Sequence, residues 1–102
     1  MYIFFQALLR NELKTDVFCE HKFLEDRKFR FDFAIISKKI AIEIEGGVYT
    51  NGRHVRGNGY IQDMEKYNLA IENGWVVLRY TPEQLNNTST LDQIIRVYKN
   101  RA

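Results

Sequence analysis

Cysteine is nearly absent from this sequence, which has only Cys19 among its 102 residues. A single cysteine cannot form an internal disulfide, so the chain is unlike the small secreted domains that depend on such bonds. The sequence also has no segment that resembles a signal peptide and no apolar run long enough to span a membrane. We therefore expect a cytoplasmic protein in which Cys19 is a structural thiol.

A large excess of charge of one sign is absent too, because 15 basic and 13 acidic residues leave a formal net charge of +2. The basic residues are unevenly placed, however, and several lie close to a group of acids in the middle of the chain. This distribution favours a polyanionic partner such as nucleic acid. Ordinary solvated surface charge explains it equally well.

Repeats, linkers and low-complexity segments are absent, and 102 residues with 45% apolar composition predict one domain, residues 1–102. The apolar periodicity predicts the order helix, strand, strand, strand, helix, strand, helix. These elements are expected at 2–14, 17–24, 28–37, 40–46, 60–73, 75–80 and 90–100, with Gly74 ending the second helix and Thr81, Pro82 and Glu83 forming a helix start. A meander followed by a crossover gives an α/β fold with a mixed four-stranded sheet flanked by helices.

The segment between Gly46 and Gly59 holds five glycines, counting both ends, and shows no periodic pattern. We interpret it as a mobile loop, and loops of this length in a compact domain are more often functional than idle. Apolar residues after this loop are assigned to packing. The expected buried positions are Trp75, Val76, Val77 and Leu78 in a strand, and Tyr60, Met64, Tyr67 and Ile71 in a stripe on the second helix.

Three acids, Asp32, Glu43 and Glu45, lie at the centre of the two most strand-like segments. A two-residue turn at 38–39 would pair these strands so that Asp32 lies opposite Glu45. A three-residue turn at 25–27 would place Glu20 opposite Asp32 in the preceding hairpin. The first of these registers leaves one face of the sheet wholly apolar and puts Asp32, Glu43 and Glu45 on the other face, and the second adds Glu20 to the row of acids.

A row of carboxylates across neighbouring strands is unfavourable, because like charges directly opposite each other are destabilising. A bound cation would compensate for this repulsion. The row contains no histidine or cysteine, so its oxygen ligands favour Mg²⁺, Mn²⁺ or Ca²⁺ over Zn²⁺. The alternation of Ile and Glu at 42–45 is by itself also typical of a half-exposed structural strand. Asp32 is harder to explain in that way, since an acid inside "FRFDFAII" is costly when it is buried without a partner.

The segments "FRFDFAII" and "EIEGG" resemble the core of the PD-(D/E)XK nuclease superfamily, which includes many restriction enzymes, VRR-NUC domains and archaeal Holliday junction resolvases. Over residues 20–81 the chain more narrowly resembles small phage and prophage endonucleases of that superfamily. The resemblance implies a restriction-endonuclease-like core with the order α-β-β-β-α-β-α. It also implies a Mg²⁺- or Mn²⁺-dependent DNA endonuclease that acts on branched or damaged DNA or on replication intermediates, in the cytoplasm of a bacterial host cell.

By resemblance, the Mg²⁺ ligands are Asp32, Glu43 and the backbone carbonyl of Ile44. Glu20 resembles an additional acid that some members bring from an earlier element. The family's lysine position is occupied here by Glu45, which we count among the catalytic residues because some branches replace this lysine by an acid or relocate it. Lys66, on the second expected helix, is the best candidate for a relocated lysine, and a solvated lysine paired with nearby acids is the alternative.

Five residues are candidates for contacts with DNA: Arg27, Arg30, Arg53, His54 and Arg56. Arg27 and Arg30 either line the DNA groove or brace the acids by ion pairing. The other three lie in the glycine-rich loop, where glycines let backbone and side chains approach a phosphate closely. An exposed loop histidine without a function is the alternative for His54.

Two other functions are compatible with the same residues. Without the motif lysine, a non-catalytic DNA-binding module of the same fold is the alternative to a nuclease, and a nuclease subunit that is active only with a partner protein is a third possibility. Cleavage of a four-way junction needs two active sites in one assembly, so the nuclease hypothesis also predicts a homodimer.

Overall fold

A mixed four-stranded sheet forms the centre of the structure, a computed structural model that describes residues 2–46, 49–50, 53–54 and 58–102. Its strands are β1 (Phe18–Lys22), β2 (Arg30–Ile35), β3 (Ile40–Ile44) and β6 (Val76–Tyr80), in the spatial order β1-β2-β3-β6. The first three strands are antiparallel neighbours, whereas β6 runs parallel to β3. Three helices complete the fold: α1 (Ile3–Leu13), α2 (Asn58–Glu72) and α3 (Thr88–Asn100).

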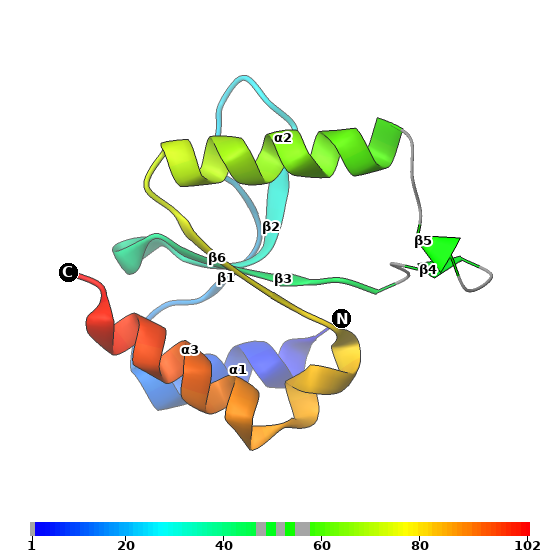
Figure 1. Cartoon of the computed structure of the whole chain (residues 1–102). Coiled ribbons are helices and arrows are strands. Elements are labelled where there is room, and N and C mark those ends of the chain that lie inside the picture. The colour runs from blue at the N-terminus through cyan, green and yellow to red at the C-terminus, as the bar shows by residue number, and fades with distance from the viewer. Residues whose placement is uncertain (1, 47–48, 51–52, 55–57) are drawn as a thin grey trace.

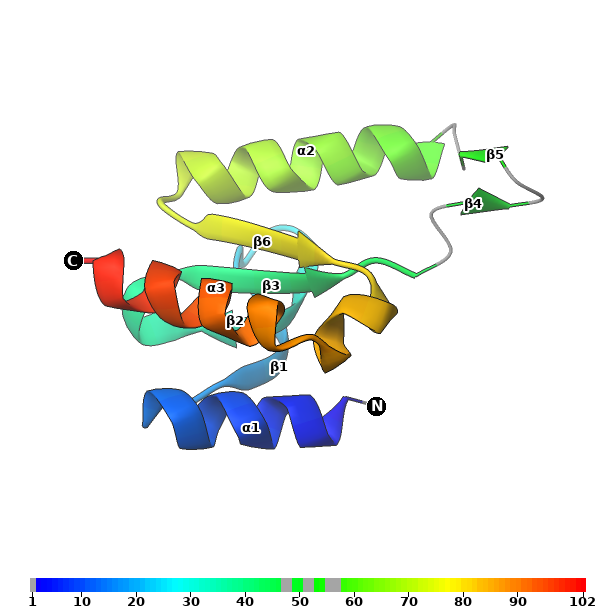
Figure 2. The same ribbon diagram turned by 60° about the horizontal axis from the view of Figure 1, so that its bottom comes forward.

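The helices lie on both faces of this sheet. α2 covers one face, and α1 and α3 cover the other (Figure 1). In the turned view of Figure 2 the four strands follow one another in the order of the sheet, with α3 in front of them. The predicted order of helices and strands and the mixed sheet are confirmed, so the chain is an α/β protein. None of the described helices combines the length and the apolar character needed to cross a lipid bilayer.

The structure also contains short 3-10 helices and two short strands. The predicted helix start after β6 is confirmed as a 3-10 helix, η2 (Pro82–Asn86), at which the Thr81 backbone N–H donates to the side-chain oxygen of Gln84 (2.8 Å). β4 (Tyr49–Thr50) and β5 (Arg53–His54) pair with each other inside the segment interpreted as a loop. Residues 47–48, 51–52 and 55–57 of that segment lie outside the described residues, whereas Gly46 is described.

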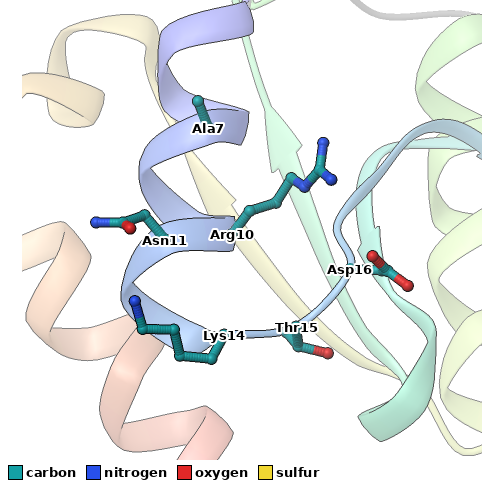
Figure 3. A pocket seen from close by; sticks show the side chains of 6 residues that line it. All are labelled: Ala7, Arg10, Asn11, Lys14, Thr15 and Asp16. Atoms are coloured by element: carbon teal, nitrogen blue, oxygen red, sulfur yellow. The ribbon is translucent and has the colours of Figure 1, made fainter.

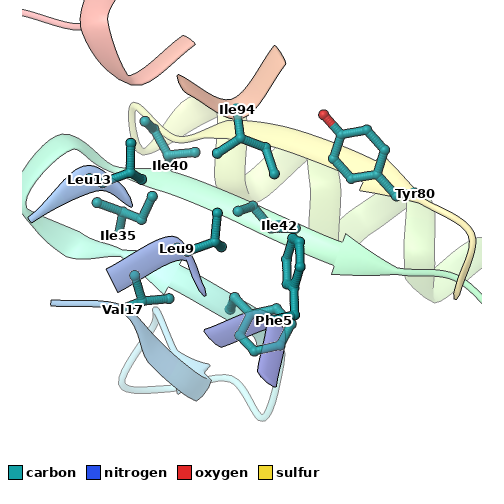
Figure 4. Packing of buried hydrophobic residues seen from close by; sticks show 10 residues of the cluster. Phe5, Leu9, Leu13, Val17, Ile35, Ile40, Ile42, Tyr80 and Ile94 are labelled. Atoms are coloured by element: carbon teal, nitrogen blue, oxygen red, sulfur yellow. The ribbon is translucent and has the colours of Figure 1, made fainter. Parts of the chain in front are cut away.

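The larger hydrophobic core lies between the sheet and the pair α1 and α3 (Figure 4). Its buried members are Phe5, Leu9 and Leu13 of α1, Val17 just before β1, Phe33 and Ile35 of β2, Ile40 and Ile42 of β3, Tyr80 of β6 and Ile94 of α3. Along β2 and β3 these residues alternate, as strands with one face against helices require. The apolar face predicted for the two strands is therefore the face that the structure buries beneath α1 and α3.

A second, smaller core packs α2 against the opposite face of the sheet. Ala34 of β2 pairs directly with Ala41 of β3, and Ala70 of α2 packs in the same cluster. Side chains this small let the helix backbone lie close to the sheet. The preceding turn of α2, which carries Lys66 and Tyr67, is thereby placed near β3.

The buried side of α2 differs from the apolar stripe predicted from the sequence. Tyr60, Met64 and Ile71 are 41%, 50% and 64% exposed, so their assignment to the core is wrong. The side that faces the sheet is centred on Ala70 and Lys66, one residue away from the stripe. One residue corresponds to a rotation of about 100° around the helix axis. The small core and the charged group described below set this rotation.

The turn between β2 and β3 is longer than the predicted two-residue turn. Residues 36–38 form the 3-10 helix η1 (Ile36–Lys38), and Lys39 follows in a left-handed conformation (φ 52°). Ile35 consequently pairs with Ile40, so the register differs by two residues from the predicted one. Because the shift is an even number of residues, the shift itself moves no side chain to the other face of the sheet.

Contacts with the end of α3 explain this turn. The Lys38 ammonium donates to the carbonyl oxygens of Tyr98 (3.2 Å) and Arg101 (3.0 Å), and it lies 4.6 Å from the centre of the Tyr98 ring. The Arg101 guanidinium in turn donates to the carbonyls of Lys38 and Gly74. These partners lie 60 and 63 positions further along the chain, where a local sequence pattern does not reveal them.

α2 ends at Glu72, and Gly74, the residue predicted to stop this helix, caps it. This residue has φ 86°, its N–H donates to the Ile71 carbonyl (3.0 Å), and the N–H of Trp75 donates to the Ala70 carbonyl (2.9 Å). The pair of bonds is a Schellman motif, and the contact of Trp75 with Ala70 in the small core accompanies it. A left-handed glycine thus directs the chain from α2 into β6.

Gly74→Ala is expected to lower the free energy of unfolding by about 1 kcal/mol, measured by urea denaturation. A Cβ at this position would meet Lys39 Cδ at 3.7 Å, an ordinary contact, so the cost comes from the left-handed backbone. Gly59→Ala is the matched control, because within the described residues no heavy atom lies within 4 Å of its Cβ position. In the first turn of α2 this second change should be neutral or stabilising. Equal destabilisation by both would contradict the backbone explanation.

Candidate functional site

Asp32 on β2 and Glu43 on β3 lie where the ladder between these two strands ends. The last pair of that ladder is Phe33 with Ile42. One step further, the backbone N–H of Asp32 donates to Glu43 Oε2 (2.7 Å), and the backbone N–H of Ile44 donates to Asp32 Oδ2 (2.7 Å). Each carboxylate is therefore fixed by the backbone of the opposite strand. We call this reciprocal pair, Asp32 with Glu43, the acid pair.

The row of three carboxylates predicted from the sequence is not formed. Because the β2–β3 register is shifted by two residues, Asp32 faces Glu43 and the predicted opposition to Glu45 is wrong. The predicted β1–β2 register is confirmed, but Glu20 is exposed and has a left-handed backbone (φ 52°). Among the described residues, no group of three or more His, Cys, Asp or Glu side chains is arranged to hold a metal ion.

A change of face along β2 explains how Asp32 comes to point at β3. Phe31 belongs to the small core beneath α2, whereas Phe33 belongs to the large core on the other face. Residues two positions apart in a regular strand share a face, so β2 rotates at Asp32. Glu20 is left-handed at the same level of the neighbouring strand β1. On this edge strand Cys19 is exposed, which contradicts its predicted role as a structural thiol.

Two residues of α2 contact the acid pair from the face of the sheet that this helix covers. The Lys66 ammonium forms an ion pair with Glu43 Oε1, and the Tyr67 hydroxyl donates to the same oxygen (3.3 Å). The side chains of Lys66 and Glu43 are only 12% and 6% exposed. The structure thus brings Lys66, predicted as a relocated lysine, to the acids rather than leaving it in solvent.

Burial and the neighbouring charges determine the protonation of this group. Burial raises the pKa of Glu43 above its ordinary value of 4.5, and the charge of Asp32 acts in the same direction. The Lys66 ammonium and the Asp32 backbone N–H lower that pKa without cancelling the effect of burial. Burial and the charge of Glu43 also raise the pKa of Tyr67, so its hydroxyl remains a protonated donor. The buried carboxylate is therefore only partly compensated by its protein partners.

The raised pKa of Glu43 predicts a pH-dependent difference between the wild type and Glu43→Gln. The unfolded chain releases this proton near pH 4.5, whereas the folded chain keeps it to higher pH. Stability is therefore lost as pH rises from 4.5 through the folded pKa. Urea unfolding in EDTA should show the wild type losing stability relative to Glu43→Gln across that range. The exposed Glu83→Gln is the control, and a relative gain by the wild type would contradict the raised pKa.

Glu45 and Arg79 form a second charged pair next to the acid pair. β3 and β6 are parallel, and their register places Arg79 beside Glu43. The Arg79 guanidinium donates through Nε and through Nη2 (2.8 Å) to the two carboxylate oxygens of Glu45. It also lies 4.5 Å from the centre of the Tyr67 ring. The hydrogen bonds to Glu45 raise the pKa of Arg79, which is charged at every physiological pH.

Sequence reasoning missed Arg79 and assigned Tyr67 to the core. A signal for Arg79 was present, because it is the one charged residue in the apolar segment "WVVLRY". Its position beside Glu43 depends on the parallel pairing of β3 with β6, which alternation along the chain does not specify. Tyr67 directly follows Lys66, and two consecutive helical residues on the sheet-facing side were not expected.

No family model, curated protein or solved structure matches the chain. The resemblance to PD-(D/E)XK nucleases therefore depends on the motif segments alone.

The acid pair offers the ligand chemistry of a hard divalent cation. Mg²⁺ is usually bound through one or two carboxylates, with water and substrate phosphate completing its shell, so two acids suffice. Asp32 and Glu43 are held in place by the opposite strands, and the buried Glu43 is only partly compensated. These residues fit Mg²⁺ or Mn²⁺, and the Ile44 carbonyl stays a predicted third ligand. The structure does not bring Glu20 to this group.

The five predicted DNA-binding residues differ in their surroundings, and the side chains of only two of them are described. Arg27 forms an ion pair with Glu65 of α2 (2.9 Å) and lies over the Phe29 ring, so it ties the β1–β2 turn to α2. Arg30 is exposed, and its guanidinium donates to the Glu20 carbonyl (3.4 Å). The backbone of Arg53 and His54 forms β5, but their side chains are not described. Arg56 lies outside the described residues.

A cavity of about 670 Å³ lies away from the acid pair, at the C-terminal end of α1 (Figure 3). It is lined by Ala7, Arg10, Asn11, Lys14, Thr15 and Asp16. These residues belong to α1 and the segment that follows it, and none belongs to the charged groups around Glu43. The cavity is open to solvent and polar, so the candidate site remains the acid pair with Lys66, Tyr67, Glu45 and Arg79.

Proposed function

We propose that this protein is a divalent-metal-dependent DNA endonuclease of the PD-(D/E)XK type with a restriction-endonuclease-like core. The observation that supports this proposal is the acid pair. Its two carboxylates accept hydrogen bonds from backbone N–H groups at the end of the β2–β3 ladder, and a buried lysine is paired with one of them. A structural role does not require two acids and a lysine in such a position, since apolar residues of similar volume are often as stable. The motif resemblance over residues 20–81 points to the same chemistry.

Each residue has a distinct part in this proposal. Asp32, Glu43 and the Ile44 carbonyl hold the cation. Mg²⁺ held by these residues would supply positive charge for the scissile phosphate and would lower the pKa of a water molecule. Lys66 keeps an ammonium group beside the acids, where it balances charge and orients the attacking water. The Tyr67 hydroxyl remains a fixed donor to Glu43 because its pKa is raised.

The test of this proposal is cleavage of a labelled DNA panel with Mg²⁺, Mn²⁺ or EDTA. The panel contains plain duplex, nicked duplex, flap, single strand and four-way junction. Metal-dependent cleavage of at least one substrate is the expected result, and preference for the junction would support structure-selective action. Intact DNA under every metal would contradict the proposal for the isolated chain.

A non-catalytic DNA-binding module is the second candidate. It is favoured by one observation, the presence of Glu45 at the family's lysine position with its carboxylate held by Arg79. Such a module would bind DNA equally well in Mg²⁺ and in EDTA and leave it intact. A subunit that depends on a partner protein would cleave only after that partner is added.

Junction cleavage also predicts a homodimer, because two strands must be cut within one assembly. Light scattering at micromolar concentration should then give twice the chain mass of 12.1 kDa. Addition of a four-way junction should yield a complex with two chains per junction. A monomeric mass at this concentration in both the free and the DNA-bound state would contradict dimerisation.

A further inference from the structure

The two cations of the candidate site differ in their access to solvent. The side chain of Lys66 is 12% exposed and is paired with the buried Glu43, whereas that of Arg79 is 52% exposed. Both lie on the α2 side of the sheet, near three carboxylates: Asp32, Glu43 and Glu45. A solvent-borne anion that approaches these acids meets Arg79 before it meets Lys66.

The Arg79 guanidinium is held in a defined orientation. Glu45 takes hydrogen bonds from Nε and Nη2, and the guanidinium lies 4.5 Å from the centre of the Tyr67 ring. Within the described residues its hydrogen bonds go to Glu45 alone, so three of the five N–H donors of the group are left for another acceptor. A planar cation that is already oriented loses little side-chain entropy when it binds an anion.

The charge around this position also calls for a cation that contacts the substrate. Asp63 of α2 adds to the negative potential that Arg79 experiences from Glu45. A phosphodiester brought next to these acids is repelled unless a positive group receives it. Arginine suits this task, because its fork of donors matches two oxygens of one phosphate.

We propose that Arg79 is a phosphate-binding residue that recognises the backbone of nucleic acid at this site, with Tyr67 as its platform and Glu45 as a competing acceptor. The proposal relies on the proposed function for the identity of the substrate. In the free protein Glu45 occupies two donors of Arg79 and neutralises part of its charge, so Glu45 competes with an incoming phosphate for the guanidinium even though three donors are left. Glu45 thus tunes affinity for the substrate, in addition to any part in binding the metal.

This mechanism predicts opposite effects for the two members of the pair. In Ca²⁺, a metal that usually supports binding without turnover, DNA affinity is measured by fluorescence anisotropy on the duplex and on the four-way junction. Arg79→Gln should weaken binding about tenfold and reduce the slope of log affinity against log salt by about 1. Glu45→Gln should tighten binding several-fold, and that gain should vanish in the Arg79→Gln background. A purely structural ion pair predicts instead that both single variants leave affinity unchanged or weaken it alike.

Matched controls separate this role from general charge and from folding. Arg96→Gln removes the same charge from an exposed position on α3, across the sheet from α2, and should leave the salt slope nearly unchanged. Thermal unfolding of every variant shows whether the fold is retained. Arg79→Lys keeps the positive charge but loses the planar, paired N–H donors of the guanidinium. Wild-type protein that cleaves DNA while Arg79→Gln binds as tightly as wild type would overturn the inference alone. Wild-type protein that neither binds nor cleaves DNA would overturn the proposed function together with it.

Discussion

Asp32→Asn should abolish metal-dependent cleavage while leaving the fold intact. The asparagine side-chain oxygen can still accept the Ile44 N–H, so the reciprocal arrangement of the two strands persists. The negative charge that attracts the cation is lost, however, and cleavage should fall by roughly three orders of magnitude or more. Single-turnover cleavage in Mg²⁺ of the preferred substrate is the measurement, with thermal unfolding as a check on the fold.

Glu43→Gln should have a similar effect on cleavage, because Glu43 is the other half of the acid pair. Asp92→Asn is the matched control, since it makes the same change at an exposed position on α3, on the opposite face of the sheet. Cleavage that survives in folded Asp32→Asn and Glu43→Gln protein would show that the acid pair is not the catalytic centre. Loss in the Asp92→Asn control as well would point to an indirect effect of charge.

Lys66→Met should destabilise the protein strongly in the absence of metal. Its ammonium compensates the buried carboxylate of Glu43, and breaking such a pair by removing one partner costs about 3–5 kcal/mol. Mg²⁺ should restore part of this loss, because the cation and the ammonium compete for the same carboxylate. The variant should therefore bind Mg²⁺ more tightly than the wild type and yet cleave DNA more slowly. Urea unfolding with and without Mg²⁺, calorimetric titration and single-turnover cleavage measure the three effects.

A double variant distinguishes this explanation from simple loss of packing. Adding Glu43→Gln to Lys66→Met removes the uncompensated charge, so the double variant should be more stable than Lys66→Met alone. Lys99→Met, at an exposed position near the end of α3, should change neither stability nor metal affinity appreciably. If Lys66→Met were no less stable than the wild type, or bound Mg²⁺ more weakly, the role assigned to Lys66 would be wrong.

The faces of the central strands could be predicted from the sequence, but one register could not. Alternation places Phe33 and Ile35 on one face of β2 and Ile40 and Ile42 on one face of β3, and any turn that shifts the register by an even number of residues keeps these two faces on the same side of the sheet. The pairing of β2 with β3 depends instead on the turn at residues 36–39. That turn is held by carbonyls at the end of α3, far along the chain, so no local rule for turns specifies it.

The candidate site was predicted in part for the same reason. Asp32 and Glu43 belong to one hairpin, and the motif contained both. Lys66 was found because it lies on the helix that covers the hairpin, although its burial against Glu43 depended on the rotation of α2. Arg79 was missed because the crossover brings β6 alongside β3 only in three dimensions. Glu20 was misplaced because a left-handed backbone at a glutamate is rare and nothing in the sequence indicates it.

The contacts between Lys38 and the end of α3 have a consequence for the order in which the nascent chain folds. The three-stranded meander is synthesised before residues 98–101, so its β2–β3 turn lacks these partners until those residues are made. Until residues 76–80 follow, β3 is also an edge strand whose partner is missing. The early chain therefore exposes an unpaired strand that holds Ile40 and Ile42. We expect it to engage chaperones on the ribosome until residues 76–101 have been made.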